Sequence, residues 1–433
     1  MLFKDITIID DQFDVKEHMY VGVKDDKIDY VSAAAPAQDY GEVYSGENRL
    51  LIPAFYNAHS HLPMFLVRGY GENLPLMTWL NDRIFPFEAQ LTPDDMYYGA
   101  LMGIAEMLRY GIAGTTEMYL NYGALARALA EGGVKANYAA CVFCFDDASY
   151  FDLPIFRETL ESIREYDGFD GGRIRTMFSL HAEYTSTEKA ARGIAEAAAK
   201  NGSTMHVHVS ETAGEVAACR ERHNGRSPVR YLADCGIFDV PAVAAHCVYV
   251  DDNDIAILKE HGVTVATCPK SNAKLASGIC PVTSLLKAGV NVALGTDSVA
   301  SNNNLNMTEE MRFFNLMQKA ANFDPTVITP EQTLYAATRA GALAQQREDC
   351  GFIKEGFKAD LTVFDIGGIC MKPSYNLLSN LVYAASGSDV VLTMVDGRVL
   401  YRDGSYPMLD IERINYECEK SRTRILGALA AAK

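Results

Sequence analysis

The sequence predicts an α/β fold, a (β/α)8 TIM barrel with a small β-sandwich formed by the N- and C-terminal segments. Two observations lead to this prediction. The middle of the chain alternates short apolar runs with longer segments of helical character, which is typical of parallel strands joined by helices. The two ends of the chain instead alternate polar and apolar residues with turn signals between them, as antiparallel strands do.

Eight apolar runs in the middle of the chain are candidates for the barrel strands. They span residues 50–61, 114–119, 135–145, 173–184, 203–211, 241–250, 263–272 and 291–300. Most segments between them have a helical pattern, and several close on a glycine, as the C-termini of helices often do. Eight strand–helix units are the number that closes a barrel of this kind.

The β patterns at the two ends predict one further domain. Asp-Gly pairs at 396–397 and 403–404 indicate tight turns between antiparallel strands. We therefore expect the β-sandwich to be discontinuous and the barrel to lie between its halves. The predicted division is residues 1–52 and 348–410 for the sandwich, 53–347 for the barrel, and 411–433 for a C-terminal helix.

Composition narrows the classes of partner. The 433 residues carry a formal net charge of −17, and a strongly acidic chain repels nucleic acid and anionic membranes. No apolar run approaches the ~18 residues of a membrane span, and the N-terminal segment lacks the features of a signal peptide. We expect a cytoplasmic protein with a small-molecule substrate.

Ten cysteines are scattered along the chain, mostly in apolar, strand-like runs. Cys141 and Cys144 form a C-x-x-C pair, but no second pair accompanies them, as a structural zinc site would require. Free cysteine behaves as a small hydrophobic residue in such runs. We expect these two residues to pack in the core.

The stretch FYNAHSHLPMF, residues 55–65, places His59 and His61 one residue apart. In a β-strand, side chains at i and i+2 share one face, so both rings would point the same way. Two interpretations are open at this point. The pair could be hydrogen-bonded core histidines, or it could be part of a metal site.

The distribution of the other histidines favours the metal site. A barrel places functional residues at the C-terminal ends of its strands. Six of the nine histidines fall at predicted strand ends, namely His59, His61, His181, His206, His208 and His246. Two carboxylates, Glu211 and Asp297, share that location. The remaining histidines, His18, His223 and His261, look like surface residues.

Three imidazoles and one carboxylate form a plausible ligand set for one divalent metal ion. His59, His61 and His208 would supply nitrogen and Asp297 oxygen, which suits Zn²⁺ best, with Fe²⁺ and Mn²⁺ as alternatives. Such an ion lowers the pKa of a bound water molecule toward neutrality.

Other strand-end residues suit supporting roles around such an ion. Glu211 follows His208 by three residues and is a candidate proton shuttle, while His246 could hydrogen-bond the attacking water. His206 would support the site from below or pack in the core.

Taken together, four motifs resemble the amidohydrolase superfamily. They are HSH at 59–61, HVHVSE at 206–211, AAHCV at 244–248 and GTDSVASNNNLNM at 295–307. Within the superfamily they resemble the S-adenosylhomocysteine/5′-methylthioadenosine deaminases, whose neighbours include the triazine chlorohydrolases. The resemblance covers nearly the whole chain, including the return segment EGFKADLTVFD at 355–365.

The resemblance implies a role for each strand-end residue. The metal would be held by His59, His61, His208 and Asp297. Asp297 would also accept a proton from the metal-bound water, Glu211 would protonate a ring nitrogen, and His246 would orient the hydroxide. Attack at the amino-bearing carbon would release ammonia. His181 stands where two-metal relatives carry a bridging lysine, which implies a single metal.

The resemblance also implies the substrate contacts. The segment at 75–88 is similar to the family segment that lies over the substrate, and its Glu88 matches the acid that binds the ribose hydroxyls. His181 matches the substrate-binding histidine after the fourth strand, and the stretch at 268–281 resembles the loop after the seventh. Trp79, the single tryptophan, would cap the base or fill the core.

Two departures from the family pattern bear on the substrate. Relatives that bind S-adenosylhomocysteine are expected to carry an arginine before strand four, but Ile155 stands at that position and Arg157 lies two residues later. Glu183 stands where the family more often has proline, and we expect it to add negative charge near the pocket mouth. Both departures favour an uncharged 5′-substituent.

The sequence therefore predicts a metal-dependent hydrolytic deaminase of the adenine ring of a 5′-modified adenosine. Candidates are 5′-methylthioadenosine, 5′-deoxyadenosine, adenosine and S-adenosylhomocysteine. One alternative is a deaminase or chlorohydrolase of another aromatic N-heterocycle, such as guanine, a pterin or a triazine. Another is a catalytically silent relative that acts as a binding protein. Because relatives are commonly dimers or larger, we expect a homo-oligomer.

Overall fold

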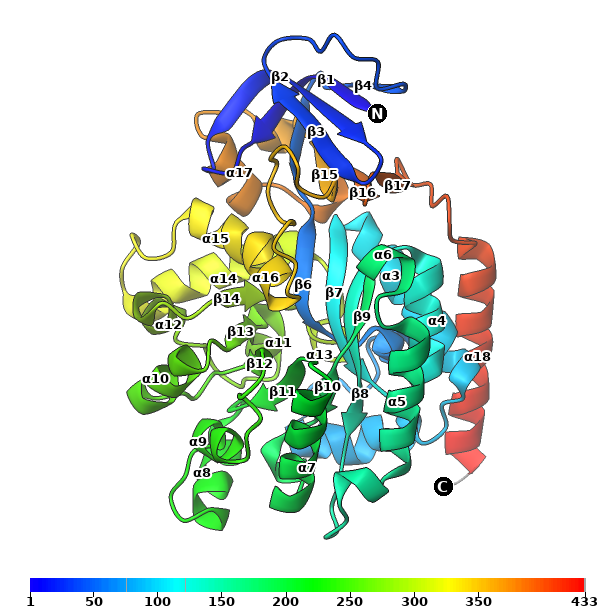
Figure 1. Ribbon diagram of the computed structural model, residues 1–433, viewed down its shortest axis with the longest axis vertical. Coiled ribbons are helices and arrows are strands. Elements are labelled where there is room, and N and C mark those ends of the chain that lie inside the picture. Colours follow the sequence, from blue (N-terminus) through cyan, green and yellow to red (C-terminus); the bar gives the residue numbers. More distant parts are fainter. Residues whose placement is uncertain (75, 121, 432–433) are drawn as a thin grey trace.

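The computed structural model describes residues 1–74, 76–120 and 122–431, arranged as a barrel with a sheet above one end (Figure 1). Pro75, at the start of the predicted segment 75–88, lies outside the described residues, as do Asn121, Ala432 and Lys433. Within the described ranges, no helix is long and apolar enough to cross a membrane.

Eight parallel strands form the barrel in the order of the sequence, which confirms the predicted fold class. They are β6 (Phe55–Ser60), β7 (Ile112–Tyr119), β8 (Lys135–Val142), β10 (Phe178–Leu180), β11 (Met205–Val209), β12 (Ala242–His246), β13 (Thr264–Thr267) and β14 (Val292–Leu294). A short strand, β9 (Ile174–Thr176), pairs with the first half of β8. The barrel closes where Ser60 and Asp297 form a parallel bridge and the amides of Thr296 and Asp297 donate to the carbonyl of His59.

Helices surround the barrel, and the segments predicted as helical are helices. Those after β6 and β7 are η1 (Leu62–Val67), α1 (Leu76–Trp79), η2 (Leu80–Ile84), α2 (Phe85–Glu88), α3 (Pro93–Arg109) and α4 (Tyr122–Gly132). Those from β8 to β12 are η3 (Tyr150–Asp152), α5 (Pro154–Tyr166), α6 (Phe169–Gly172), η4 (Glu183–Thr185), α7 (Glu188–Lys200), α8 (Ala213–Arg222) and α9 (Pro228–Asp234). Those after β12 are α10 (Asp252–Glu260), α11 (Pro269–Lys274), α12 (Val282–Ala288), α13 (Val299–Asn302), α14 (Met307–Asn322), α15 (Pro330–Ala337) and α16 (Arg339–Ala344).

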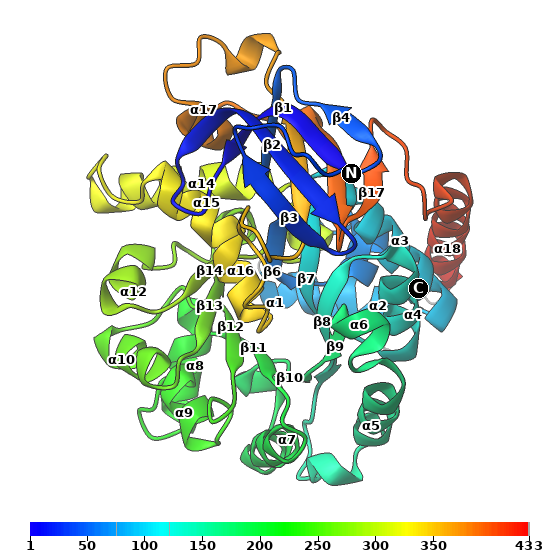
Figure 2. The ribbon, with the colours of Figure 1, turned by 45° about the horizontal axis from the view of Figure 1, so that its top comes forward.

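The terminal segments combine in one eight-stranded sheet. Its order is β17–β16–β15–β5–β1–β2–β3, with β4 paired to β1. The strands are β1 (Leu2–Ile9), β2 (Val15–Lys24), β3 (Lys27–Ser32), β4 (Val43–Ser45), β5 (Arg49–Pro53), β15 (Leu361–Asp365), β16 (Val390–Val395) and β17 (Arg398–Arg402). Antiparallel pairing of β5 with β15 joins the two ends of the chain, and apolar side chains from both ends share one core cluster. In Figure 2 this sheet, blue and orange, comes forward over the barrel.

Turn chemistry at the C-terminal end follows the prediction. Asp396 and Gly397 both have left-handed backbone angles, with φ of 46° and 72°, as the tight turn between β16 and β17 requires. The remaining elements are η5 (Ile369–Met371), α17 (Leu377–Tyr383), η6 (Gly387–Asp389) and α18 (Ile411–Ala431). Helix α18 packs beside α3, on the outside of the barrel.

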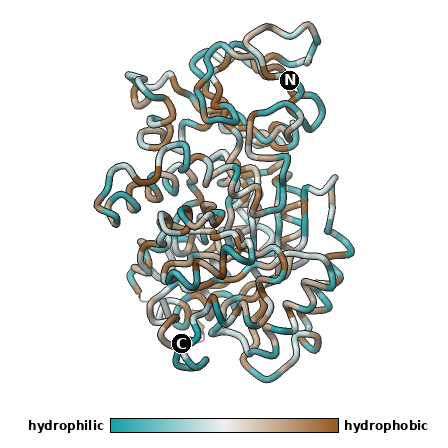
Figure 3. Tube along the Cα trace, turned by 60° about the vertical axis from the view of Figure 1, so that its left-hand side comes forward, coloured by the Kyte–Doolittle hydropathy of each residue, from teal (hydrophilic) through white to brown (hydrophobic). Residues whose placement is uncertain are grey.

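One expectation about the strands is wrong in detail. The apolar run 50–61 is two strands, because β5 pairs with β1 and β15 in the terminal sheet, whereas β6 pairs with β7 in the barrel. Ala54 lies between them, and its amide donates to the carbonyl of Asp360. Both strands are buried, so no polar residue in the sequence marks the point at which the chain passes from one sheet to the other. In Figure 3 the hydrophobic stretches run through the middle of the molecule and the outer turns are largely hydrophilic.

A buried ionic cluster joins the barrel floor to the terminal sheet, and we call it the floor cluster: Tyr56, Lys135, Asp360 and Asp396. The Lys135 ammonium lies 2.6 Å from an oxygen of Asp360 and 2.6 Å from Oδ1 of Asp396. The Tyr56 hydroxyl donates to Asp360. Burial lowers the pKa of Lys135, but the neighbouring carboxylates outweigh burial and hold that pKa above its usual value. The cluster contains its own cation.

Candidate metal centre and active site

The four predicted ligands converge at the C-terminal end of the barrel. His59 and His61 come from the end of β6, His208 from β11, and Asp297 from the residues just after β14. The Nε2 atom of His61 lies 3.3 Å from Nε2 of His208 and 3.4 Å from Oδ1 of Asp297. Nε2 of His59 lies 3.7 Å from the same carboxylate oxygen. Ligands that bind zinc tetrahedrally at ~2.1 Å are ~3.4 Å apart, so these separations suit one ion.

Hydrogen bonds fix which nitrogen of each imidazole faces the centre. Nδ1 of His61 donates to the carbonyl of Met118 at 2.6 Å, and Nδ1 of His208 donates to the carbonyl of His181 at 2.7 Å. Each neutral ring therefore keeps its lone pair on Nε2. Nε2 of His59 is fully buried and has no hydrogen-bond partner among the described residues. A buried polar atom of this kind calls for a partner, and a metal ion fits the donor set around it.

The surroundings of the three imidazole rings lower their pKa values and so favour the neutral form. Burial and the neighbouring histidines hold the pKa values of His59 and His208 well below their usual value. Burial also lowers the pKa of His61, against the opposing charge of Asp297. Neutral imidazole is the form that binds a metal, so no proton has to be removed from these rings.

Three donors orient the Asp297 carboxylate. The Ser298 amide donates to Oδ1 at 2.7 Å, and the hydroxyls of Ser271 and Ser301 donate to Oδ2 at 2.5 and 2.8 Å. Asp297 itself has a left-handed φ of 58°, which turns the chain sharply after β14. Neither serine was predicted from the sequence, although each lies within a stretch that resembles the family.

His206 lies beneath the ligands. Its Nε2 is 2.9 Å from Nδ1 of His59, so it hydrogen-bonds the ring nitrogen of His59 that points away from the centre. The two rings meet at 88°. This contact is the supporting interaction expected for His206 and not packing alone.

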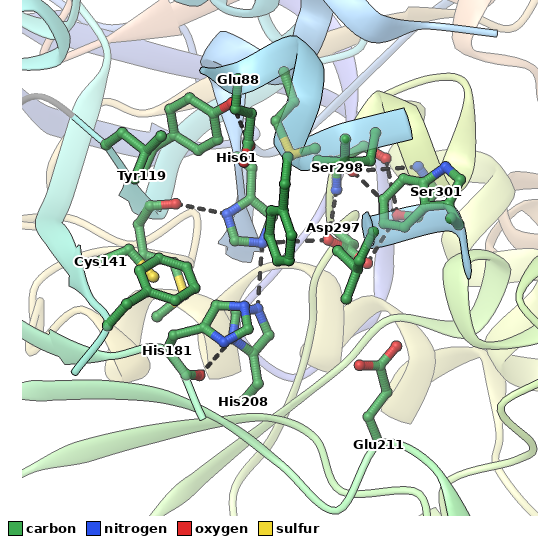
Figure 4. A pocket seen from close by; sticks show the side chains of 18 of the residues that line it. His61, Glu88, Tyr119, Cys141, His181, His208, Glu211, Asp297, Ser298 and Ser301 are labelled. Atoms are coloured by element: carbon green, nitrogen blue, oxygen red, sulfur yellow. Dashed lines mark hydrogen bonds and ion pairs between the residues drawn. The ribbon is translucent and has the colours of Figure 1, made fainter. Parts of the chain in front are cut away.

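Two further titratable groups face the centre. His246 ends β12 with a left-handed φ of 71°, and its Nδ1 donates to Oδ1 of Asn272 at 2.9 Å. Although burial lowers the pKa of His246, the carboxylates of Glu211 and Asp297 outweigh it and hold that pKa above its usual value. Burial raises the pKa of Glu211, which favours a protonated carboxyl there. Figure 4 shows Glu211 across the pocket from His208 and Asp297.

These residues line a cavity at the C-terminal end of the barrel. The predicted site residues on its wall are His61, Trp79, Glu88, His181, His208, Glu211, His246 and Asp297. His59 is buried behind them. The rest of the wall is largely apolar and includes Met64, Leu80, Ile84, Phe85, Phe143 and Leu275.

The segment from α1 to α2 lies over this cavity, as the sequence predicted. It contributes five wall residues, Trp79, Leu80, Ile84, Phe85 and Glu88. Its middle part, η2, is a π-helical turn, and such turns are often found at functional sites.

Glu88 is paired with a residue that the sequence analysis did not single out. The Tyr119 hydroxyl donates to Oε1 of Glu88 at 2.7 Å, and both side chains face the cavity in Figure 4. Burial raises the pKa of Glu88 to about 7. Tyr119 is the last residue of β7, and barrels place functional residues at the C-terminal ends of their strands. A tyrosine within an apolar run is nevertheless hard to distinguish from a core residue by sequence alone.

His181 follows β10 and stacks on Phe143, with ring centroids 4.4 Å apart. Its Nδ1 is 2.9 Å from Oγ1 of Thr185, and burial, together with His61 and His246, lowers its pKa to about 3. Cys141 is buried on the same side of the cavity, and Cys144 is buried as well, in line with core packing. Neither cysteine forms a disulfide.

The expectation for Glu183 is wrong. Its carboxylate is 1% exposed, and it pairs with the guanidinium of Arg222 at 2.7 Å and the ring of His223 at 2.6 Å. Paired in this way, it adds no free negative charge at the pocket mouth. His223 is consequently half-buried and not a surface residue, and His261 is half-buried beside the carbonyl of Phe238.

Arg157 is exposed on α5, and the cavity wall does not include it. Ile155, at the position where the family arginine was expected, is half-buried. Among the described residues that line the cavity, none is arginine or lysine.

Comparison with known proteins places the chain. Residues 50–400 match the model of the amidohydrolase family. The chain is 39% identical over 421 residues to the 5-methylthioadenosine/S-adenosylhomocysteine deaminase of Dictyoglomus thermophilum, which covers 97% of each chain. It is also 39% identical over 387 residues to the protein of that name from Pelotomaculum thermopropionicum, covering 89% of this chain and 88% of the relative.

Solved structures agree with these matches. An adenosine deaminase from Xanthomonas campestris with bound zinc superposes with a TM-score of 0.91 at 31% identity, over 98% of both chains. The atrazine chlorohydrolase of Arthrobacter aurescens, complexed with zinc, has a TM-score of 0.88 at 20% identity, which shows a shared fold. It covers 97% of this chain and 99% of its own.

The predicted fold and the predicted family are confirmed, and a hydrolase of C–N bonds agrees with both comparisons. With the matched model extending over most of the sequence and the relatives over nearly all of it, the chain belongs to the amidohydrolase family.

Proposed function

We propose that the protein is a metal-dependent hydrolytic deaminase that removes the 6-amino group of an adenosine with an uncharged 5′-substituent. The observation that carries this proposal is the position of Glu211, a buried carboxyl on the cavity wall that follows the proposed ligand His208 by three residues. Burial raises the pKa of Glu211, which agrees with a role as a proton donor. A dehalogenating hydrolase has less need of such an acid. The names of the relatives, 5-methylthioadenosine/S-adenosylhomocysteine deaminase and adenosine deaminase, support the same reaction.

His59, His61, His208 and Asp297 would hold the metal, with Zn²⁺ as the proposed ion and Fe²⁺ and Mn²⁺ as alternatives. When bound, such an ion would lower the pKa of a water molecule toward neutrality. Three imidazole nitrogens with one carboxylate oxygen support this assignment, as does the zinc in the Xanthomonas campestris structure.

The remaining steps belong to side chains of this protein. Asp297 accepts a proton from the attacking water, and His246 orients that water through its Nε2. Glu211 donates its proton to a nitrogen of the adenine ring, which makes the amino-bearing carbon electrophilic. Oxygen adds to that carbon, and Asp297 passes the proton it accepted to the amino nitrogen. The carbon–nitrogen bond then breaks, the nitrogen leaves as ammonia, and the hydroxyl proton of the adduct returns to Glu211, which leaves a carbonyl on the ring.

The opposite end of the cavity would hold the nucleoside. Glu88 would accept hydrogen bonds from the ribose hydroxyls in place of the one from Tyr119. His181 would contact the substrate from the end of β10, and Trp79 would lie over the base. All three residues are on the cavity wall.

The wall argues for an uncharged 5′-substituent. A carboxylate, such as that of S-adenosylhomocysteine, would enter a largely apolar cavity whose described wall residues include no arginine or lysine. Burying a carboxylate without a partner is unfavourable. 5′-Methylthioadenosine, 5′-deoxyadenosine and adenosine suit this wall better.

An ammonia-release assay on the zinc-loaded protein tests the proposal. The panel is 5′-methylthioadenosine, 5′-deoxyadenosine, adenosine, S-adenosylhomocysteine, guanine and a triazine. We expect the uncharged adenosines to have the highest kcat/KM and S-adenosylhomocysteine to trail. Turnover of guanine or the triazine alone would overturn the substrate class.

Two variants refine this test. Glu88→Ala should raise KM for nucleosides, because the ribose contact is lost, whereas unchanged kinetics would favour a ring without ribose. Arg157→Ala is the matched control and should leave every substrate unaffected. Selective loss of S-adenosylhomocysteine turnover in Arg157→Ala would overturn the uncharged preference.

We also propose that the protein works in the cytoplasm as a homo-oligomer and binds neither nucleic acid nor membranes. The net charge of −17 supports the lack of binding to polyanions. Light scattering after size-exclusion chromatography measures the assembly, and a monomer at every concentration would contradict this part.

A further inference from the structure

The loop between β11 and α8 carries Glu211, and one side chain of α8 holds that loop. The carboxylate of Glu215, in the first turn of α8, accepts hydrogen bonds from three consecutive backbone amides. Oε1 lies 2.9 Å from the Ser210 amide, and Oε2 lies 2.7 Å from the Glu211 amide. The Thr212 amide is farther away, at 3.4 Å.

These bonds exceed what a helix cap requires. In a capping box, the side chain at the fourth position binds the amide of the cap residue, here Thr212. That bond is the longest of the three. The two shorter bonds reach back to Ser210 and Glu211, which lie before the helix. Glu215 therefore fixes the loop as well as the helix end.

The loop conformation needs such support. Ser210 has a left-handed φ of 52°, which is unfavourable for a residue with a side chain. Its carbonyl accepts hydrogen bonds from the amides of Val248 at 3.0 Å and Tyr249 at 2.9 Å. These two residues come shortly after His246, the last residue of the neighbouring strand β12. The backbone at 210–212 is thus held from α8 on one side and from the end of β12 on the other.

We propose that Glu215 is a positioning residue for the reaction: by binding the amides of Ser210 and Glu211, it holds the Glu211 carboxyl in place over the substrate ring. This inference rests on the proposed function. It concerns a residue that does not line the cavity and acts only through Glu211.

Glu215→Gln is the test variant, because glutamine keeps the shape but replaces one acceptor oxygen with an NH2 group that faces a backbone N–H. We expect kcat to fall at least tenfold while KM changes by less than about threefold, since substrate contacts remain. Amide exchange measured by mass spectrometry should become faster at residues 210–212. Glu215→Asp retains both oxygens and should recover part of kcat.

Gln332→Ala is the matched control. Gln332 occupies the same position in the capping box of α15, where its Oε1 accepts from the Thr329 amide at 2.9 Å, away from the cavity. We expect it to lower the melting temperature without changing kcat. If Glu215→Gln behaves in the same way, with normal kcat and unchanged exchange at 210–212, Glu215 is only a cap and the inference is overturned.

Failure of the proposed function gives a different result. If the unmodified protein releases no ammonia from any adenosine, the reaction assignment falls. Exchange at 210–212 then decides alone, because faster exchange in Glu215→Gln supports the hold on the loop and unchanged exchange overturns it.

Discussion

The two ends of the barrel bury polar clusters that differ in whether the chain itself supplies a partner for every group. At the floor, Lys135 supplies a cation to the carboxylates of Asp360 and Asp396, and all three groups are paired within the chain. At the C-terminal end, which we call the mouth, His59, His61, His208 and Asp297 present nitrogen and carboxylate oxygen to a common point. No arginine or lysine is among the described residues of the wall.

From this difference we infer that the floor cluster serves stability and the mouth serves function. The floor cluster ties the terminal sheet to the barrel, and removal of one partner would leave a buried charge. The mouth cluster leaves Nε2 of His59 without a hydrogen-bond partner in the described structure, so its donors suit an ion from solution. Changes at the floor should therefore alter folding, whereas changes at the mouth should alter catalysis.

Removing the metal should have the largest effect. Dialysis against a chelator should reduce deamination to background, because the proposed mechanism depends on an ion that His59, His61, His208 and Asp297 would hold. Added Zn²⁺ should restore activity, measured together with metal content. Full activity in protein without metal would contradict the proposal that the residues at the mouth bind a catalytic metal.

Glu211→Gln should follow, with kcat lower by about 10²–10⁴-fold through the loss of an acid–base group. Metal content should be unchanged, since Glu211 is not among the four proposed ligands. Glu161→Gln, the same change at an exposed position on α5, is the control and should be fully active. Equal activity of the two variants would remove Glu211 from the mechanism.

Lys135→Met should destabilise the fold by about 3–5 kcal/mol, because it leaves buried carboxylates without a cation. Urea unfolding measures this change, and kcat per folded molecule should stay near normal. The double variant Lys135→Met/Asp360→Asn should recover part of the loss. A drop in kcat without a drop in stability would show that floor and mouth are not separate.

Glu88→Gln should have the smallest effect, visible as a change in the pH dependence of stability. Because the pKa of Glu88 is about 7 in the folded protein and near 4.5 unfolded, the folded state binds its proton more tightly. Stability should therefore decrease as pH rises from 4.5 to 7, and the variant should lose that dependence. Relative to the unmodified protein, Glu88→Gln should gain on the order of 1–3 kcal/mol between pH 4.5 and 8.

Unfolding at these two pH values checks the last expectation. Glu161→Gln serves again as the exposed control. The same stability difference at both pH values would show that Glu88 titrates normally in the folded state.

The sequence predicted the residues that meet at the mouth better than the residues that hydrogen-bond them. His59, His61, His208 and Asp297 could be found because a barrel brings strand ends together and because imidazoles are rare. Ser271 and Ser301 could not, since hydroxyls are common and their bonds to Asp297 depend on loop geometry.

Pairing between distant segments explains the other differences. Glu183 looked like a free acid because its partners, Arg222 and His223, come from α8 and its C-terminal end. The division of the run 50–61 at Ala54 was hidden because both resulting strands are buried. Hydrophobic patterning reports burial, and it does not report which sheet a strand joins.

The bridge between Ser60 and Asp297 also has a consequence for how the protein matures. His59 lies on the first barrel strand, His61 follows directly after it, and Asp297 follows the last strand, so the proposed ligand set spans the seam where the sheet closes. A growing chain therefore has no complete set until almost the whole barrel has been synthesised. A metal held by the proposed ligands would bind only after the last barrel strand is in place, and it would hold the seam closed.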